Sequence, residues 1–411
     1  MMAKTLRCGL LGRKLGHSYS PAIHERLADY DYRLYEVEPE NLGAFLTSGC
    51  FDGLNVTIPY KKAVLPYCAA LSDTARAIGA VNTLVRRPDG TLWGDNTDAY
   101  GFSRMVQSSG AQVRGKKALI FGSGGASATA QYVLRAMGAR EVVVISRQGE
   151  QNYDNLARHP DAQLAVNTTP VGMFPAVGES VAALSQFPNL EAALDVIYNP
   201  ARTEFLLQAE RLGLKTANGL LMLVAQAKKS CEDFLGCAVD DACISSIERQ
   251  LAAQMQNIVL LGMPGSGKTT VGQLLAQKLG RTFVDADSAL EQEAGMTIPE
   301  IFQTEGEAGF RARETAMLRK LGAQSRLILA TGGGCVTREE NYPLLHQNGT
   351  LFCLQRALDQ LPANGRPLSQ TLGVQEIFRQ RKAAYERFAD VMIDNNAAPE
   401  LAAQKILEVL A

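Results

Sequence analysis

Residues 260–270, LLGMPGSGKTT, constrain the fold of this 411-residue chain more than any other stretch. Gly262, Gly267, Lys268 and Thr269 complete the pattern G-x-x-x-x-G-K-[ST], whose glycines let backbone N–H groups turn inward around phosphate oxygens. The apolar run NIVLLG precedes the pattern and the helix-like run TTVGQLLAQKLG follows it, as a phosphate loop requires. We therefore expect an ATP-binding loop in which Lys268 reaches the β- and γ-phosphates and Thr269 ligates Mg²⁺. The residues expected to contact the nucleotide are Gly265, Ser266, Gly267, Lys268, Thr269 and Thr270.

The composition is that of a well-packed soluble protein. Apolar residues make up 46% of the chain, charged residues make up 20%, and the net charge is -1. Lys and Arg are scattered, so no basic patch indicates nucleic acid or a membrane surface, and no apolar run approaches the roughly 20 residues of a membrane span. The eight cysteines stand singly and fit neither a zinc site nor a disulfide frame, which favours a cytoplasmic protein.

Short apolar runs alternate with helix-like segments along the chain, which favours an α/β fold with parallel sheets covered by helices. The expected buried strands are LRCGLLG, GLNVTIP, KALIFG, EVVVIS, NIVLLG and RLILATGGG. Each ends in Gly, Pro or Ser, at the edge where an α/β protein opens its ligand crevice. Residues 219–255 have apolar side chains at helical spacing and end where NIVLLG begins, so we expect a domain boundary near residues 254–257.

Polar residues after the phosphate loop suit a small alcohol that carries a carboxylate. Asp285 and Asp287 follow the next expected strand, Arg311 lies in GFRARE, Gly333 in TGGG and Arg387 in AAYERFAD. Arginines beside a glycine turn can bind a carboxylate through bidentate hydrogen bonds, and an aspartate can orient a hydroxyl for attack. Each residue taken alone is explained better by a surface charge or a turn.

Together and in this order, these residues resemble shikimate kinase across nearly all of residues 256–411. The residues that the resemblance places around shikimate are Asp287, Arg311, Gly333 and Arg387. Those that it places at the transferring phosphoryl group and its Mg²⁺ ion are Lys268, Asp285, Asp287 and Arg366, the last as a lid arginine. The stretch from Leu354 to Arg366 is shorter than the usual lid and lacks the arginine that family members often place against adenine.

Three polar clusters stand out earlier in the chain: GHSYSP, NVTIPYK, and GAVNT with GDNTDAYG. Any one of them is explained by a helix cap or a turn. In sequence, and followed by LIFGSGGASA, they resemble shikimate dehydrogenase over about the first 240 residues. The resemblance implies that Ser18 and Ser20 hold the substrate carboxylate and that Lys61 and Asp98 form a catalytic dyad. Further pocket residues implied are Thr57, Asn82, Tyr198, Gly219 and Gln226, with Gly219 facing the nicotinamide.

The dyad is chemically reasonable because reducing a ketone by hydride leaves an alkoxide that needs a proton. A positioned ammonium is a suitable general acid, and a neighbouring carboxylate keeps it charged. The residues expected at the dinucleotide are Gly122, Ser123, Gly124, Gly125, Ala126, Ser146 and Arg147. Arg147 follows the second strand of the expected Rossmann unit, where an NAD-binding protein usually has an acid, so NADP is the predicted cofactor. Compared with the family that it resembles, the stretch after Gln148 is short, lacking about one helix and one strand, and Asn218 replaces the usual aspartate.

The sequence thus predicts two enzymes in one chain. Residues 1–255 form the dehydrogenase, with a substrate domain at about 1–110 and 220–255 and a Rossmann NADP domain at about 111–219, and residues 256–411 form the kinase. The first would reduce 3-dehydroshikimate and the second would phosphorylate the resulting shikimate. The alternatives are a kinase with a non-catalytic dehydrogenase-like sensor, a dehydrogenase for quinate that uses NAD, and a kinase for another small alcohol.

Overall fold

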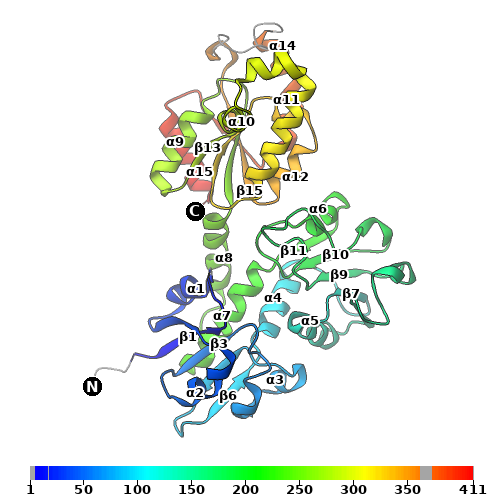
Figure 1. Cartoon of the computed structure of the whole chain (residues 1–411), viewed down its shortest axis with the longest axis vertical. Coiled ribbons are helices and arrows are strands. Elements are labelled where there is room, and N and C mark those ends of the chain that lie inside the picture. The colour runs from blue at the N-terminus through cyan, green and yellow to red at the C-terminus, as the bar shows by residue number, and fades with distance from the viewer. Residues whose placement is uncertain (1–4, 17, 362–372, 411) are drawn as a thin grey trace. The chain divides into compact units, whose positions relative to one another are not determined.

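The computed structural model describes residues 5–16, 18–361 and 373–410 (Figure 1). The chain forms two compact units. The first contains Met1–Gly172, Gly178–Tyr198 and Glu204–Arg249, and the second contains Met173–Val177, Asn199–Thr203 and Gln250–Ala411. Within the described ranges, no helix combines the length and the apolar character that crossing a membrane needs.

The first unit begins with a six-stranded mixed sheet of order β2-β1-β3-β5-β6-β4. Its strands are β1 (Arg7–Gly12), β2 (Asp31–Glu36), β3 (Gly53–Val56), β4 (Cys68–Leu71), β5 (Thr83–Arg86) and β6 (Leu92–Asp95). Its helices are α1 (Ser20–Leu27), α2 (Leu42–Thr47) and α3 (Asp73–Ile78), with 3-10 turns η1 (Pro39–Asn41) and η2 (Leu65–Tyr67). The sequence predicts parallel sheets, but β5 runs antiparallel to β3 and β6. A short turn joins β5 to β6, and such a turn can connect only antiparallel strands.

The second sheet is parallel, with the order β11-β10-β9-β7-β8. Its strands are β7 (Lys117–Phe121), β8 (Glu141–Ile145), β9 (Leu164–Asn167), β10 (Ala192–Asp195) and β11 (Lys215–Ala217). The helices of this region are α4 (Asp98–Ser108), α5 (Gly125–Ala136), η3 (Tyr153–Arg158), η4 (Leu184–Gln186), α6 (Glu204–Arg211) and α7 (Leu220–Leu235). Phe102 and Leu134 are buried on one face and Phe187 and Phe205 on the other, which explains why the strand sequences are continuously apolar. Only η3 separates β8 from β9, so β8 is the edge strand, as the short stretch after Gln148 predicts.

The second unit contains a parallel sheet of order β13-β14-β12-β15-β16. Its strands are β12 (Asn257–Leu261), β13 (Phe283–Asp285), β14 (Ile328–Ala330), β15 (Gly349–Gln355) and β16 (Val391–Asp394). Helix α8 (Ala242–Met255) begins in the first unit and leads into β12. The helices after β12 are α9 (Lys268–Leu279), α10 (Ala286–Ala294), α11 (Ile298–Gly322), η5 (Cys335–Thr337), α12 (Asn341–His346), η6 (Leu358–Gln360), α14 (Val374–Phe388) and α15 (Pro399–Leu410). Helices α9 and α15 cover one face through Leu275 and Ile406, and α11 and α12 cover the other through Leu318 and Leu345 (Figure 1). The predicted fold class, a Rossmann unit followed by a P-loop α/β domain, is confirmed.

Candidate active sites

A cavity of about 550 Å³ opens in the first unit at the carboxyl ends of β1 and β3. The residues predicted for the dehydrogenase that line it are Ser18, Ser20, Thr57, Lys61, Asn82, Asp98, Ala126, Tyr198, Gly219 and Gln226. They come from the β1–α1 loop and the start of α1, the turn after β3, the residue before β5, the starts of α4 and α5, the loop after β10, and helix α7 with the residue before it. The structure therefore brings residues more than 200 positions apart in the sequence to one cavity.

Lys61 and Asp98 are in direct contact in this cavity. The Lys61 Nζ donates a hydrogen bond to Asp98 Oδ2 at 2.5 Å, and Asn82 Nδ2 donates to Asp98 Oδ1 at 3.0 Å. Asp98 is the first residue of α4, where the positive end of the helix favours a carboxylate. Asn82 is itself held because the backbone N–H of Thr97 donates to its Oδ1 at 2.7 Å. Asp98 thus contacts Lys61 through Oδ2 and Asn82 through Oδ1, and these two contacts orient its carboxylate.

Gly219 and Tyr198 shape the opposite wall of the cavity. A Cβ on Gly219 would lie 1.9 Å from the carbonyl oxygen of Val196, so only glycine fits between this strand end and the cavity. Burial raises the pKa of Tyr198, and Tyr19 contacts its ring edge-on at 6.1 Å between centroids. The phenol therefore stays protonated at neutral pH and can donate a hydrogen bond to a ligand.

The predicted dinucleotide loop follows β7 at the carboxyl edge of the second sheet. Gly122 has φ +108°, a conformation that favours glycine, and α5 begins at Gly125. A Cβ on Gly124 or Gly125 would meet no atom within 4 Å, so the face of the loop above them is open. Ser146 and Arg147 follow β8, the strand beside β7, and therefore lie at the same sheet edge. Ala126 is the residue of this loop that also lines the substrate cavity.

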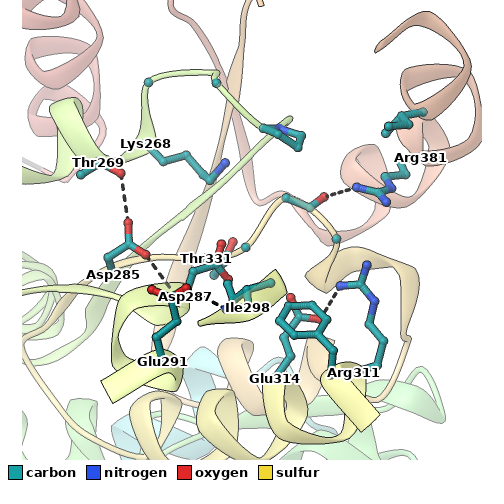
Figure 2. A pocket seen from close by; sticks show the side chains of 18 of the residues that line it. Lys268, Thr269, Asp285, Asp287, Glu291, Ile298, Arg311, Glu314, Thr331 and Arg381 are labelled. Atoms are coloured by element: carbon teal, nitrogen blue, oxygen red, sulfur yellow. Dashed lines mark hydrogen bonds and ion pairs between the residues drawn. The ribbon is translucent and has the colours of Figure 1, made fainter. Parts of the chain in front are cut away.

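The second unit has a cavity of about 620 Å³ at the carboxyl edge of its sheet. Figure 2 shows Lys268, Thr269 and Asp285 at one end of it and Arg311 and Arg381 at the other. The residues predicted for the kinase that line it are Gly265, Gly267, Lys268, Thr269, Thr270, Asp285, Asp287, Arg311 and Gly333. Ser266 is fully buried beneath the loop, where its carbonyl oxygen accepts a hydrogen bond from Asn395.

The phosphate-loop end offers oxygen ligands of the kind that Mg²⁺ prefers. Thr269 Oγ1 donates to Asp285 Oδ2 at 3.0 Å, while Asp285 Oδ1 accepts from the backbone N–H groups of Asp287 and Ser288 and caps α10. The cap fixes Asp285 with one oxygen toward Thr269. Lys268 Nζ donates to the carbonyl oxygens of Gly262 and Met263 at 2.8 and 3.0 Å, so the lysine folds over its own loop. The hydroxyl and carboxylate fit a hard divalent cation held next to phosphates.

Asp287 lies in the same cavity near a second buried carboxyl group. Burial raises the pKa of Asp287 to about 6, and the neighbouring Glu314 adds to the shift. Arg311 Nη1 donates to Glu314 Oε2 at 2.7 Å, and both side chains are less than 10% exposed. Burial also raises the pKa of Glu314, although Arg311 opposes that shift. Glu314 thus fixes Nη1 of Arg311, whereas Nη2 donates to the exposed Glu307 Oε1 at 3.4 Å, a longer contact that a bound anion could replace.

The structure corrects one predicted residue. Arg387 does not line the cavity; its guanidinium pairs with Glu339 at 2.9 Å, and its side chain is 57% exposed. Arg381 lines the cavity instead and donates from Nη1 to the carbonyl oxygen of Gly333 at 3.0 Å. The two arginines are six positions apart on α14, so they project from different faces of that helix. Arg366, the predicted lid arginine, lies outside the described residues.

Three further cavity residues were missed by the sequence reasoning. Asn55 lines the first cavity, where Tyr32 Oη donates to its Oδ1 at 2.7 Å and its Nδ2 is buried without a hydrogen-bond partner in the described chain. Glu314 and Arg381 line the second. Their spacing in the sequence could have indicated them, because each shares a face of a strand or helix with another residue of its site. Asn55 stands two residues before Thr57, Glu314 lies one helical turn after Arg311, and Arg381 precedes Tyr385 by four residues.

Two family models match the chain. The model described as shikimate kinase matches residues 264–411, and the model described as shikimate dehydrogenase substrate binding domain matches residues 10–84. A shikimate dehydrogenase (NADP(+)) from Clostridium perfringens is 35% identical over 264 aligned residues, covering 59% of this chain and 97% of that protein. Another, from Caldicellulosiruptor bescii, is 39% identical over 249 residues, covering 53% of this chain and 85% of that protein.

Solved structures give the same assignment for the first unit. A chorismate mutase/shikimate 5-dehydrogenase fusion protein from Clostridium acetobutylicum superposes with a TM-score of 0.57 at 35% identity, covering 61% of this chain and 98% of that one. Shikimate 5-dehydrogenase from Thermus thermophilus, solved with NADP(H) and shikimate, superposes with a TM-score of 0.55 at 32% identity, covering 60% and 99%.

The folds and the two cavities define a dinucleotide-dependent dehydrogenase joined in one chain to a P-loop kinase. The chain belongs to the shikimate dehydrogenase family, and its C-terminal part is a shikimate kinase domain.

Proposed function

We propose that this chain catalyses two consecutive steps: reduction of 3-dehydroshikimate to shikimate with NADPH, then phosphorylation of the shikimate 3-hydroxyl with ATP and Mg²⁺. Residues 1–255 would carry the first activity and residues 256–411 the second. The single observation that carries the proposal is the 2.5 Å contact between Lys61 and Asp98 in a chain that also has a phosphate loop facing Asp287 and Arg311. A chain that used only one of these cavities would not need the other set of residues.

In the first cavity, the residues of the chain would bind the substrate and supply a proton. NADPH, when bound, supplies the hydride that reduces the ketone. The Lys61 ammonium then gives its proton to the developing alkoxide, and Asp98 keeps that ammonium oriented. Ser18 and Ser20 donate to the carboxylate. The cavity residues that would surround the ring hydroxyls are Thr57, Asn82, Asp98 and Gln226.

In the second cavity, the residues would hold the alcohol at one end and phosphates at the other. Mg²⁺-ATP, when bound, supplies the phosphoryl group, and Thr269 and Asp285 would hold the metal ion. Arg311 and Arg381 would bind the substrate carboxylate. Asp287 accepts the hydrogen bond of the 3-hydroxyl and receives its proton as the new O–P bond forms and the bond to the ADP leaving group breaks.

Two observations weigh against the alternatives. A non-catalytic sensor would have no use for an ammonium held in contact with a carboxylate, yet Lys61 and Asp98 are both present and paired. An NAD-dependent quinate dehydrogenase would be expected to carry an acid after β8, where this chain has Arg147.

The test is a coupled reaction of the purified full chain with 3-dehydroshikimate, NADPH and Mg²⁺-ATP. Loss of NADPH absorbance and formation of shikimate 3-phosphate, followed by mass spectrometry, should proceed in a ratio of about one to one at completion. Omitting ATP should stop the reaction at shikimate, and omitting NADPH should prevent both products. Chelating Mg²⁺ should abolish only the phosphorylation. A chain that phosphorylates added shikimate but never consumes NADPH would support the sensor alternative instead.

A further inference from the structure

Lys14 lies in the loop between β1 and α1 and lines the first cavity, which Ser18 and Ser20 also line. Its neighbours are anchored elsewhere: Arg13 Nε donates to Glu38 Oε2 at 2.9 Å, and the backbone N–H of Leu15 donates to Glu36 Oε1 at 2.7 Å. The Leu15 side chain is also buried. These contacts fix Arg13 and Leu15 near the end of β2, whereas Lys14 lines the cavity together with Ser18 and Ser20.

Among the described residues that line this cavity, Lys14 is the charged one without a counter-charge. The ionisable side chains of opposite sign that line the cavity, Lys61 and Asp98, form an ion pair of 2.5 Å. Lys14 is exposed, and the part of the chain that the structure describes provides it with neither an ion pair nor a hydrogen bond. Because the dyad is neutral as a pair, Lys14 gives the cavity wall one net positive charge, although the whole chain has a net charge of -1.

An ammonium in a cavity that two serine hydroxyls also line suits an anionic group of the ligand. Hydroxyls give a carboxylate hydrogen bonds from neutral donors, whereas an ammonium adds the attraction between opposite charges. The flexible four-carbon stem of lysine also lets the ammonium adjust its position to that of the bound carboxylate.

We propose that Lys14 is a substrate-binding residue that pairs with the carboxylate of the hydroxylated ring acid and selects anionic over neutral substrates. The proposal rests on the proposed function, which makes the ligand of this cavity a small carboxylic acid. It adds to the proposed dehydrogenase a specificity residue that neither the sequence motifs nor the family resemblance indicates.

The experiment compares Lys14→Met with the wild-type full chain in the oxidation of shikimate by NADP⁺, followed by NADPH absorbance. Two substrates are used, shikimate and its uncharged methyl ester. We expect Lys14→Met to raise the KM for shikimate about tenfold with kcat changed less than twofold, because the interaction is made equally in the ground state and the transition state. On the methyl ester, which the wild type should already bind weakly, the variant should show no further loss. Lys14→Arg should restore most of the affinity for shikimate.

The matched control is Lys62→Met, which removes an exposed lysine of the same unit that does not line the cavity. It should leave both substrates unaffected, which separates a local contact from a change in overall charge. Phosphorylation of shikimate by the same Lys14→Met protein should also be unchanged.

Three results would overturn the role of Lys14: an unchanged KM for shikimate, an equal loss on acid and ester, or a rise in the KM for NADP⁺ alone, which would assign Lys14 to the cofactor phosphates. A wild-type chain that oxidises no shikimate would instead contradict the proposed function, and the role of Lys14 with it.

Discussion

Arg381 donates a hydrogen bond from its guanidinium to the carbonyl oxygen of Gly333 at 3.0 Å. Tyr385, one turn further along α14, donates to the same oxygen. The two contacts join α14 to the glycine turn after β14 and hold one buried guanidinium at the cavity wall, opposite the Arg311 and Glu314 pair.

The first prediction distinguishes the two arginines of α14. Arg381→Ala should raise the KM for shikimate in the kinase reaction roughly 10- to 100-fold, because a charge-assisted contact to the carboxylate is lost. Arg387→Ala, which removes an equal charge from the same helix, should change it less than about twofold because that side chain pairs with Glu339 at the surface. Steady-state kinase assays of both variants test this. The reverse ranking would restore Arg387 as the binding residue.

The second prediction concerns the pH dependence of phosphorylation. Because burial raises the pKa of Asp287 to about 6, the carboxylate that must accept the substrate proton is lost as the pH falls below that value. We expect kcat/KM for shikimate to fall about tenfold per pH unit below pH 6. A rate that stays flat to pH 5 would mean that Asp287 is not the group that titrates.

The raised pKa of Asp287 also predicts an effect on the free energy of unfolding. A carboxyl group whose pKa is higher in the folded than in the unfolded state binds more protons when folded, so stability falls as the pH rises from about 4 to about 6. Asp287→Asn should therefore be inactive as a kinase yet more stable than wild type at pH 7.5, by the order of 1–3 kcal/mol, with the difference vanishing below about pH 4. Urea unfolding of the second unit at the two pH values measures it. A variant less stable at pH 7.5 would show that the contacts of Asp287 outweigh its burial.

The third prediction separates the two activities. Lys61→Ala should lower NADPH-dependent reduction by ~10²–10⁴ and leave shikimate phosphorylation nearly unchanged, because the proton donor is removed from the first cavity only. Lys62→Ala is the control, since the neighbouring lysine is exposed and outside the cavity. If both activities fell together in a folded Lys61→Ala protein, the two cavities would not act independently.

The fourth prediction concerns the choice of dinucleotide. Arg147→Asp should weaken NADPH binding strongly and NADH binding little, because attraction to the 2′-phosphate becomes repulsion. The ratio of kcat/KM for the two cofactors measures the effect. An equal loss for both would place Arg147 away from the ribose.

The sequence by itself determined the α/β class, several of the buried strands and most of the local chemistry. The phosphate loop and the glycine turns after β7 and β14 each depend on a few neighbouring residues, so their patterns can be read along the chain. Lys61 and Asp98 are 37 positions apart, and it was the family resemblance that paired them. The tertiary structure decided the strand directions and side-chain orientations that depend on contacts between residues far apart in the sequence. It turned β5 antiparallel to β3, chose Arg381 over Arg387 by the face of α14 that meets Gly333, and placed Lys14 and Asn55 in one cavity wall. A one-dimensional pattern records which side chains are present, but the direction in which each projects is set by packing against partners far away in the sequence.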